Sequence, residues 1–163
     1  MWSTFLILGF GAGAILLQTT LLHLAPTGPA IPDLILVMCV YLGLRHQSVG
    51  GAVGAFFLGY MLDTFSGTDV GINAFAMTLV FLMVYLLSRR LWIEGGLSNS
   101  LAVFAAAVLK TLTITGLVAV STGALTAGGM RDDLLGGALA AIVSPLVFGA
   151  LGRAKGWFGV TQQ

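Results

Sequence analysis

The chain has 163 residues, of which 58% are hydrophobic and only 8% are charged, and its formal net charge is +1. A soluble domain carries about 25% charged residues, so these figures exclude an ordinary water-exposed surface. The small net charge also excludes a polybasic surface for nucleic acid. An apolar helix is at home in lipid because it satisfies its own backbone hydrogen bonds. The composition therefore predicts a membrane protein.

Apolar runs divide the chain into six predicted helices. They cover residues 3–24, 32–44, 48–65, 71–88, 97–121 and 133–152. A membrane span needs about 20 residues, so six spans and their connections occupy nearly the whole chain, although the second helix is short. We therefore predict an all-α integral membrane protein in which residues 1–163 form a single domain, a six-transmembrane-helix bundle.

The basic residues indicate how this bundle is oriented. Six spans place the second connection, the fourth connection and the C-terminal tail on one side of the membrane, and these segments carry Arg45, Arg89, Arg90, Arg153 and Lys155. On the other side Arg131 is alone. Lys and Arg are enriched in cytoplasmic segments, so both termini are predicted to be cytoplasmic.

Two acidic residues adjoin apolar runs rather than open loops. Asp33 lies about a dozen residues before Arg45, and Asp63 follows the same turn by a similar length of helix. At about 1.5 Å per residue they lie ~18 and ~24 Å from that turn, in the outer half of a hydrocarbon core ~30 Å thick. A carboxylate there should face protein, a partner or a water pocket. The alternative is that both are helix-end residues at the wet interface, and Asp33 after Pro32 also fits a helix start.

Lys110 lies inside the fifth predicted helix, near the same depth as these two acids. An ion pair with Asp33 or Asp63 would offset the unfavourable burial of its charge. Alternatively, its long side chain extends to the membrane surface. The sequence leaves both the choice of partner and this alternative open.

Glycine is abundant, at 23 residues, and the third predicted helix contains Gly50, Gly54 and Gly59. Small residues allow transmembrane helices to approach closely. Such positions either serve packing inside the bundle or receive a helix of a partner protein.

Catalytic motifs are not found in the sequence. It contains no Cys-x-x-Cys, His-Glu-x-x-His or Gly-x-Ser-x-Gly pattern. His23 and His46 lie at opposite ends of predicted spans, too far apart in depth to share a metal. We therefore predict a protein that is not an enzyme and has no cofactor or metal.

Four short pieces of sequence between residues 31 and 76 follow one another in a specific order. They are Pro32-Asp33-Leu34, Tyr41-Leu42-Gly43-Leu44-Arg45, Gly59-Tyr60-Met61-Leu62-Asp63, and Ser66-Gly67-x-x-x-Gly71 followed by Ala74. In this order and spacing, and in a six-span protein of this length, they resemble the family of the rod shape-determining protein MreD. The third helix is richer in glycine than expected for that family.

The resemblance implies a non-enzymatic scaffold or regulatory subunit of the bacterial elongation (rod) complex in the inner membrane, supporting cell-shape-determining peptidoglycan synthesis. It implies MreC as a binding partner, together with MreB, RodA, a class B penicillin-binding protein and membrane lipid. It also implies a fold similar to the substrate-binding subunits of energy-coupling-factor transporters. The combined candidates for partner binding or structure are Pro32, Asp33, Gly50, Gly54, Gly59, Asp63, Gly67, Gly71 and Lys110.

The main alternative is a small-molecule carrier, a vitamin-binding subunit of a membrane transporter. Residues 25–30 and 123–132 of the predicted outer connections contain no Trp, Tyr or Phe, which argues against stacking on a flat vitamin. Asp33, Asp63 and Asp69 remain candidates for binding a cationic solute. A proton-coupled transporter that uses Asp63 is a weaker alternative, because no broken inverted repeat is evident.

Overall fold

The computed structural model describes residues 13, 32–45, 47–66, 71–90, 95–122 and 130–157. These residues form five helices: α2 (Leu34–Arg45), α3 (Val49–Ser66), α4 (Ile72–Ser88), α5 (Gly96–Thr122) and α6 (Met130–Trp157). They agree with the last five predicted helices to within a few residues, and α6 extends further at both ends. The first predicted helix, residues 3–24, lies outside the described residues apart from Gly13, which is helical.

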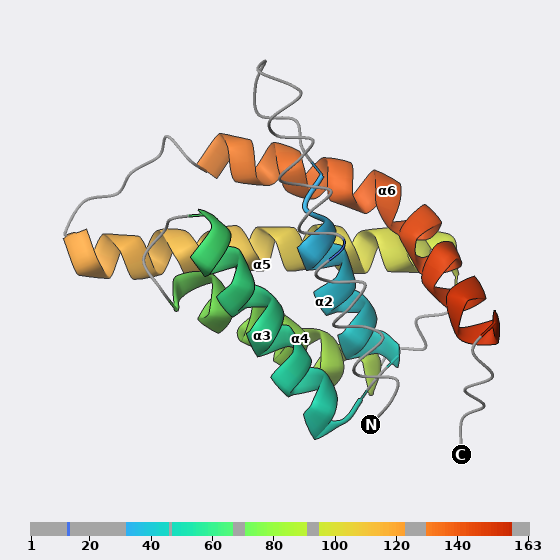
Figure 1. Ribbon diagram of the computed structural model, residues 1–163. Coiled ribbons are helices and arrows are strands. Elements are labelled where there is room, and N and C mark those ends of the chain that lie inside the picture. Colours follow the sequence, from blue (N-terminus) through green and yellow to red (C-terminus); the bar gives the residue numbers. More distant parts are fainter. Residues whose placement is uncertain are drawn as a thin grey trace.

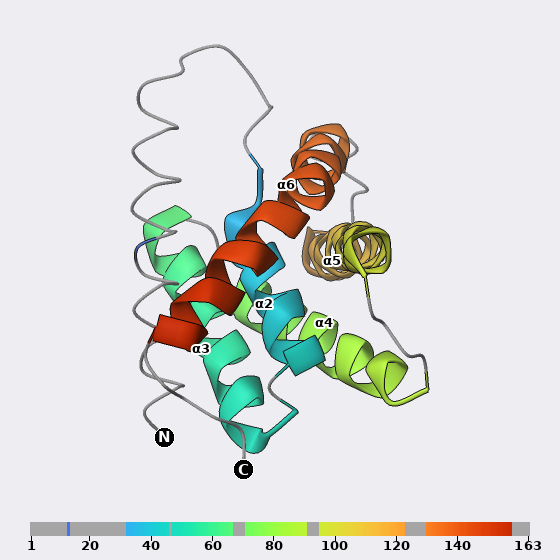
Figure 2. The ribbon, with the colours of Figure 1, turned by 90° about the vertical axis from the view of Figure 1, so that its right-hand side faces the viewer.

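The short helix α2 lies at the centre of the described bundle (Figure 2). It has nine consecutive buried residues, from Ile35 to Gly43, and contacts α3, α4, α5 and α6. A helix that is apolar on all sides is buried on all sides. Its 12 residues reach only about 18 Å, less than a hydrocarbon core of ~30 Å. Because the surrounding helices bury α2, its length need not equal the thickness of the hydrocarbon core.

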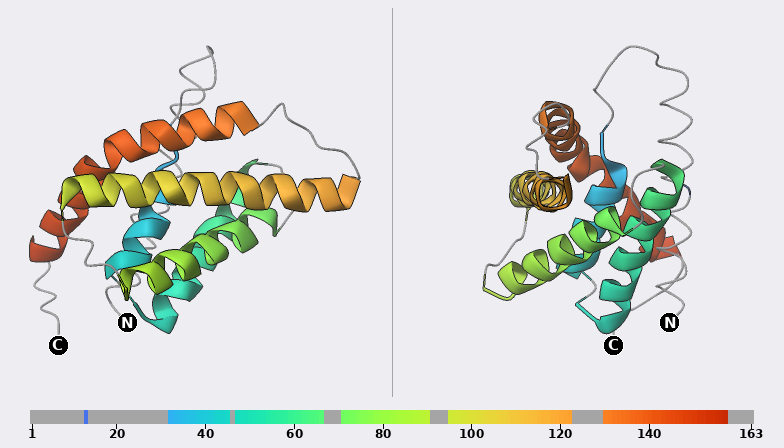
Figure 3. Two further views of the ribbon diagram at one scale, coloured as in Figure 1. Left: turned by 180° about the vertical axis from the view of Figure 1, so that it is seen from behind. Right: turned by 90° about the vertical axis from the view of Figure 1, so that its left-hand side faces the viewer.

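The other helices form two pairs around α2 (Figure 1). In one pair α3 packs against α4, and in the other the long helices α5 and α6 run side by side (Figure 3). Two segments in the described part of the chain are long and apolar enough to cross a membrane, Gly96–Ser121 and Asp133–Arg153. Large apolar side chains face outward on the bundle, among them Phe56, Phe75 and Ile142. Such an outer surface suits lipid better than water.

Helix α6 bends near Pro145 (Figure 1). A proline nitrogen carries no hydrogen, so the carbonyl of Ala141 loses its usual helical donor. The hydroxyl of Ser144 replaces it, donating to the Ala141 oxygen at 2.8 Å. Ser144 is fully buried, and its oxygen lies 3.3 Å from the hydroxyl oxygen of Ser100 on α5. The carbonyl group freed by the proline therefore keeps a hydrogen bond within α6, and Ser144 also links the bend to α5.

Glycines allow close helix contacts inside the bundle. A Cβ added to Gly137 of α6 would lie 2.3 Å from the Cβ of Ala107 on α5. A Cβ on Gly43 of α2 would lie 2.9 Å from a methyl carbon of Val84 on α4. Gly54 is buried as well, and its Cβ position is at an ordinary 3.5 Å from Leu42. These glycines face neighbouring helices of the same chain, whereas Gly50 is only half-buried.

Candidate functional site

The carboxylate of Asp63, at the end of α3, binds the N-terminus of α4. One oxygen accepts the backbone N–H of Asn73 and its side-chain amide, both at 3.0 Å. The other accepts the backbone N–H groups of Gly71 at 2.9 Å and Ala74 at 3.1 Å. The first N–H groups of a helix have no partner within the helix and carry partial positive charge. Asp63 therefore caps α4 from a different helix.

Two glycines permit this contact. Gly59 lies one turn before Asp63 on the same face of α3, and a Cβ there would be 2.6 Å from the Cα of Ala74 and from the carbonyl oxygen of Asn73. Gly71, the N-cap of α4, has φ 107°, a conformation that favours glycine. The Gly-x-x-x-Asp spacing thus brings the backbone of α4 against α3 and places a carboxylate at its end. Gly67 lies outside the described residues.

Asp63 lies in the last turn of α3, as the helix-end alternative expected, but it is only 1% exposed and does not face solvent. A carboxylate offers about four lone-pair positions, and the four hydrogen bonds described above use them. No acceptor position is left for a cation or a solute. Chemically, the arrangement can fix α3 to α4 but is unsuited to binding and releasing a ligand.

Asp33 begins α2 and joins it to α5. One carboxylate oxygen accepts the backbone N–H of Leu36 at 2.9 Å, the usual geometry of an N-cap. The other oxygen lies 2.5 Å from the ammonium nitrogen of Lys110. The side chains are 15% and 12% exposed, respectively, so the ion pair is largely buried. Pro32 directly precedes this N-cap.

The structure thus selects Asp33 as the partner of Lys110, one of the two possibilities that the sequence left open. The alternative in which the Lys110 side chain extends to the membrane surface is wrong. Asp133 of α6 adds a weaker attraction for the same ammonium group. The backbone nitrogen of Asp33 also lies 3.5 Å from the carbonyl oxygen of Gly136 on α6. This site therefore connects α2, α5 and α6, whereas the Asp63 site connects α3 and α4.

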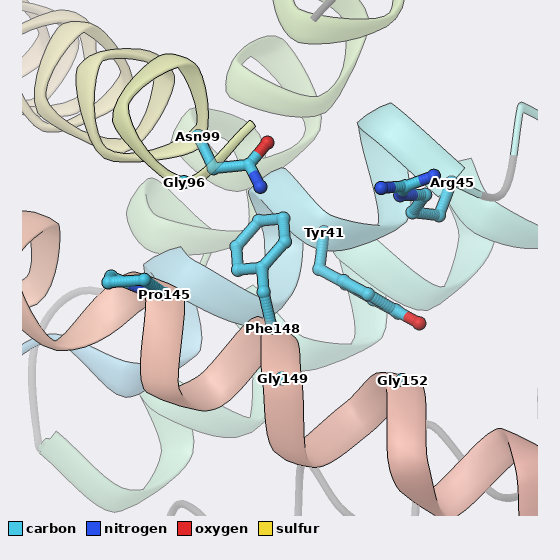
Figure 4. Close-up of a pocket in the computed structure, with 8 residues that line it drawn as sticks. All are labelled: Tyr41, Arg45, Gly96, Asn99, Pro145, Phe148, Gly149 and Gly152. Carbon is cyan, nitrogen blue, oxygen red and sulfur yellow. The ribbon is translucent and has the colours of Figure 1, made fainter. Parts of the chain in front are cut away.

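A cavity of about 470 Å³ lies at the other end of α2, α5 and α6 (Figure 4). It is lined by Tyr41, Arg45, Gly96, Asn99, Pro145, Phe148, Gly149 and Gly152. The rings of Tyr41 and Phe148 meet edge to face, with centroids 5.2 Å apart. The sequence reasoning did not identify this cavity, because three distant segments contribute to it. Pro145 within one apolar run and Asn99 near the start of another were the available signals.

In the described part of the chain no three His, Cys, Asp or Glu side chains gather in a way that would hold a metal ion. His23 and His46 are outside that part. Cys39 is buried in α2, where its thiol donates to the carbonyl oxygen of Met77 on α4 at 3.1 Å. Its place is that of a core residue.

A model of the family of the rod shape-determining protein MreD matches residues 1–151. The chain belongs to the MreD family. This is a family of membrane proteins with a role in rod shape determination, and it is not a known enzyme family. A comparison with curated proteins finds no match to the chain, and a comparison with solved structures finds none either. The expected similarity to the substrate-binding subunits of energy-coupling-factor transporters remains a prediction.

In this member of the MreD family, the described geometry gives a physical reason for the family-like pieces of the sequence. Pro32 and Asp33 start the central helix and anchor it to Lys110. Gly59 and Asp63 receive the start of α4, where Gly71 supplies the turn. These residues position helices. A direct role in partner binding is not tested by their placement and stays a prediction.

Proposed function

We propose that this protein is a non-enzymatic scaffold subunit of the bacterial elongation complex in the inner membrane, where it binds MreC and supports cell-shape-determining peptidoglycan synthesis. MreB, RodA and a class B penicillin-binding protein are the further partners that we propose. In this proposal residues 1–163 form one six-span domain with both termini in the cytoplasm. Membership of the MreD family is its main support.

The observation that carries the proposal is how the buried polar groups are used. All four acceptor positions of Asp63 bind α4, and the charge of Lys110 is paired with Asp33. These groups bind the protein's own helices, so they are not available to move protons or hold a solute. Buried polar contacts of this kind fix one arrangement of helices. A fixed arrangement suits a scaffold that binds partners better than a transporter that alternates between conformations.

The relative directions of three helices support the proposed alternation of the spans. The separation of Asp33 from Arg45 on α2 and of Lys110 from Asn99 on α5 is about a dozen residues, or ~18 Å, in each case. Because Asp33 contacts Lys110 while Arg45 and Asn99 share the cavity, α2 and α5 are antiparallel. Helix α6 runs parallel to α2, from Gly136 beside Asp33 to the cavity. Alternating directions of this kind are what successive spans require.

The carrier alternative has less support. A vitamin site needs aromatic and polar groups that converge from the outer ends of the helices. Two of the three acids considered for a cationic solute are engaged, Asp63 with α4 and Asp33 with Lys110, and Asp69 lies outside the described residues. The cavity lies at the Arg45 end instead, which the proposed orientation places on the cytoplasmic side.

Cell shape provides the test of this function. Depletion of the protein from a rod-shaped host should give rounded cells, and the unchanged protein should restore rods. The Thr64→Ala variant should restore them as well, because Thr64 is exposed and, among the described residues, its hydroxyl bonds only back to Tyr60 on its own helix. Rods that persist unchanged after complete depletion would contradict the proposal. A loss of vitamin uptake with normal shape would favour the carrier.

A further inference from the structure

The cavity at the Arg45 end of the bundle has the size and lining of a ligand site, which the proposed scaffold function does not require. It lies where the end of α2, the start of α5 and the end of α6 meet (Figure 4). Its volume of about 470 Å³ falls within the range of roughly 300–1,000 Å³ that is usual for small-molecule sites. Its lining combines one cation, one buried amide, two aromatic rings and three glycines.

Asn99 gives the clearest sign of a missing ligand. The residue is 8% exposed, and its backbone nitrogen donates to the Gly95 oxygen at 3.1 Å. Its side-chain amide has no hydrogen-bond partner among the described residues and points into the cavity (Figure 4). A buried polar group without a hydrogen-bond partner destabilises a folded protein. An amide left in this state indicates a place for a polar group that the chain itself does not supply.

The charges around the cavity favour an anion. The Arg45 side chain, at the end of α2, is part of the cavity lining, and it forms no ion pair with an acid of the described residues (Figure 4). Gly96, also in the lining, is the first residue of α5, a helix of 27 residues. The start of a helix presents backbone N–H groups and partial positive charge to an anion. A guanidinium group is well shaped to bind two oxygens of a phosphate.

The wall that α6 contributes is largely apolar. Pro145 and Phe148 form part of it, and Gly149 and Gly152 leave room because no Cβ fills it. Leu146, next to the cavity in sequence, is 76% exposed on the apolar exterior of the bundle. A ligand with a phosphate at one end and hydrocarbon at the other matches this combination. Basic sites between transmembrane helices commonly bind anionic lipid head groups.

We propose that this cavity binds the phosphate-bearing head group of an anionic membrane phospholipid. Arg45 pairs with the phosphate, the Asn99 amide and the start of α5 bond to the head-group oxygens, and the acyl chains leave along α6. The proposal goes beyond the scaffold function, since neither MreC binding nor rod shape requires a bound lipid. It rests only on the placement of the helices in a membrane.

The test uses the purified full-length protein and measures lipid binding by native mass spectrometry. Phosphatidylglycerol is titrated against phosphatidylcholine, which has the same phosphate but no net charge. We expect wild-type protein to prefer phosphatidylglycerol by at least about fivefold. Arg45→Gln should lower its affinity for phosphatidylglycerol by about five- to tenfold. Equal affinity for the two lipids, or an undiminished affinity after Arg45→Gln, would overturn the proposal.

Arg89→Gln is the matched control. Arg89 is also exposed, and its guanidinium carbon lies 5.3 Å from the ring centre of Tyr85, outside the cavity lining. This variant loses the same charge, so its affinity should stay within about twofold of the wild type. An equal loss from Arg89→Gln and Arg45→Gln would show general surface attraction and overturn the proposal.

A second variant fills the cavity without removing charge. A Cβ on Gly149 meets nothing within 4 Å, so Gly149→Leu should fold, keep its melting temperature and lose the bound phosphatidylglycerol. Retained lipid in a folded Gly149→Leu protein would overturn the site. Millimolar glycerol phosphate should not displace the lipid, whose chains add to its binding. Displacement would assign the cavity to a soluble phosphorylated compound and overturn the assignment to a lipid.

Discussion

The ammonium nitrogen of Lys110 lies 2.5 Å from a carboxylate oxygen of Asp33, although 77 positions separate the two residues in the chain. Both side chains are largely buried, at 12% and 15% exposure, respectively. An unpaired charge would be unfavourable at this position in a membrane, so each of the two charges is stabilised by the other. The pair therefore holds the start of α2 against the middle of α5.

Removal of one member of this pair should destabilise the protein strongly. Asp33→Asn leaves the charge of Lys110 buried and unpaired, and we expect a loss of about 3–5 kcal/mol in the free energy of unfolding. Unfolding in mixed detergent and SDS measures it. The double variant Asp33→Asn with Lys110→Met removes both charges and should recover most of that loss. Additive losses in the double variant would show that the two charges do not interact.

The Asp63 cap makes a second prediction about stability. Asp63→Ala leaves backbone N–H groups at the start of α4 without an acceptor, together with the Asn73 amide, and should lower the free energy of unfolding by about 3 kcal/mol or more. Asp63→Asn should have a smaller effect, because it retains one acceptor oxygen. Thr64→Ala, at the exposed neighbouring position, should change the value by less than about 0.5 kcal/mol. If Asp63→Ala is as mild as this control, the cap is not an important contact.

Two of the buried glycines of α3, Gly59 and Gly54, should respond differently to the same substitution. Gly59→Ala places a methyl group 2.6 Å from the backbone of α4, and the resulting displacement should destabilise the protein by about 1–3 kcal/mol. Gly54→Ala meets only Leu42 at 3.5 Å, and it should be neutral or stabilising by up to about 1 kcal/mol, because alanine favours a helix. Equal effects at both positions, again from SDS unfolding, would contradict the close contact between α3 and α4.

The bend of α6 predicts coupling between Ser144 and Pro145. Ser144→Ala leaves the Ala141 carbonyl without a donor and should cost about 1 kcal/mol in the free energy of unfolding. In a Pro145→Ala background the backbone N–H of residue 145 returns as a donor, so the same Ser144→Ala change should have little further effect. A double-mutant cycle measures this coupling. A cycle that closes with no coupling would show that the serine does not compensate for the proline.

Much of the helix arrangement follows from the sequence. Long apolar runs interrupted by Pro, Gly and charged turns predict the extents of α2 to α6 closely, because in lipid a helix must satisfy its backbone internally. Counting residues from the cytoplasmic ends of the helices also predicts that Lys110 lies at nearly the same depth as Asp33 and Asp63. It did not select between the two acids, because depth along a helix does not indicate which neighbour lies on which side.

The details of the candidate sites depend on contacts between distant segments. The cap on α4 needs the positive φ of Gly71 and the inward position of Asn73, neither of which has a periodic signal in the sequence. The cavity combines residues of three helices, and the role of Ser144 appears only once the bend at Pro145 is known. An asparagine such as Asn99 at the start of an apolar helix was a signal that the sequence reasoning did not use.

The proposed scaffold role is tested by gentle detergent extraction of the tagged full-length protein from its host membrane, followed by identification of the molecules that remain attached. We expect MreC to be recovered with the protein in comparable amounts and to be lost from a host in which MreC lacks its membrane helix. Recovery of the protein without MreC but with a tightly held vitamin would contradict the scaffold function.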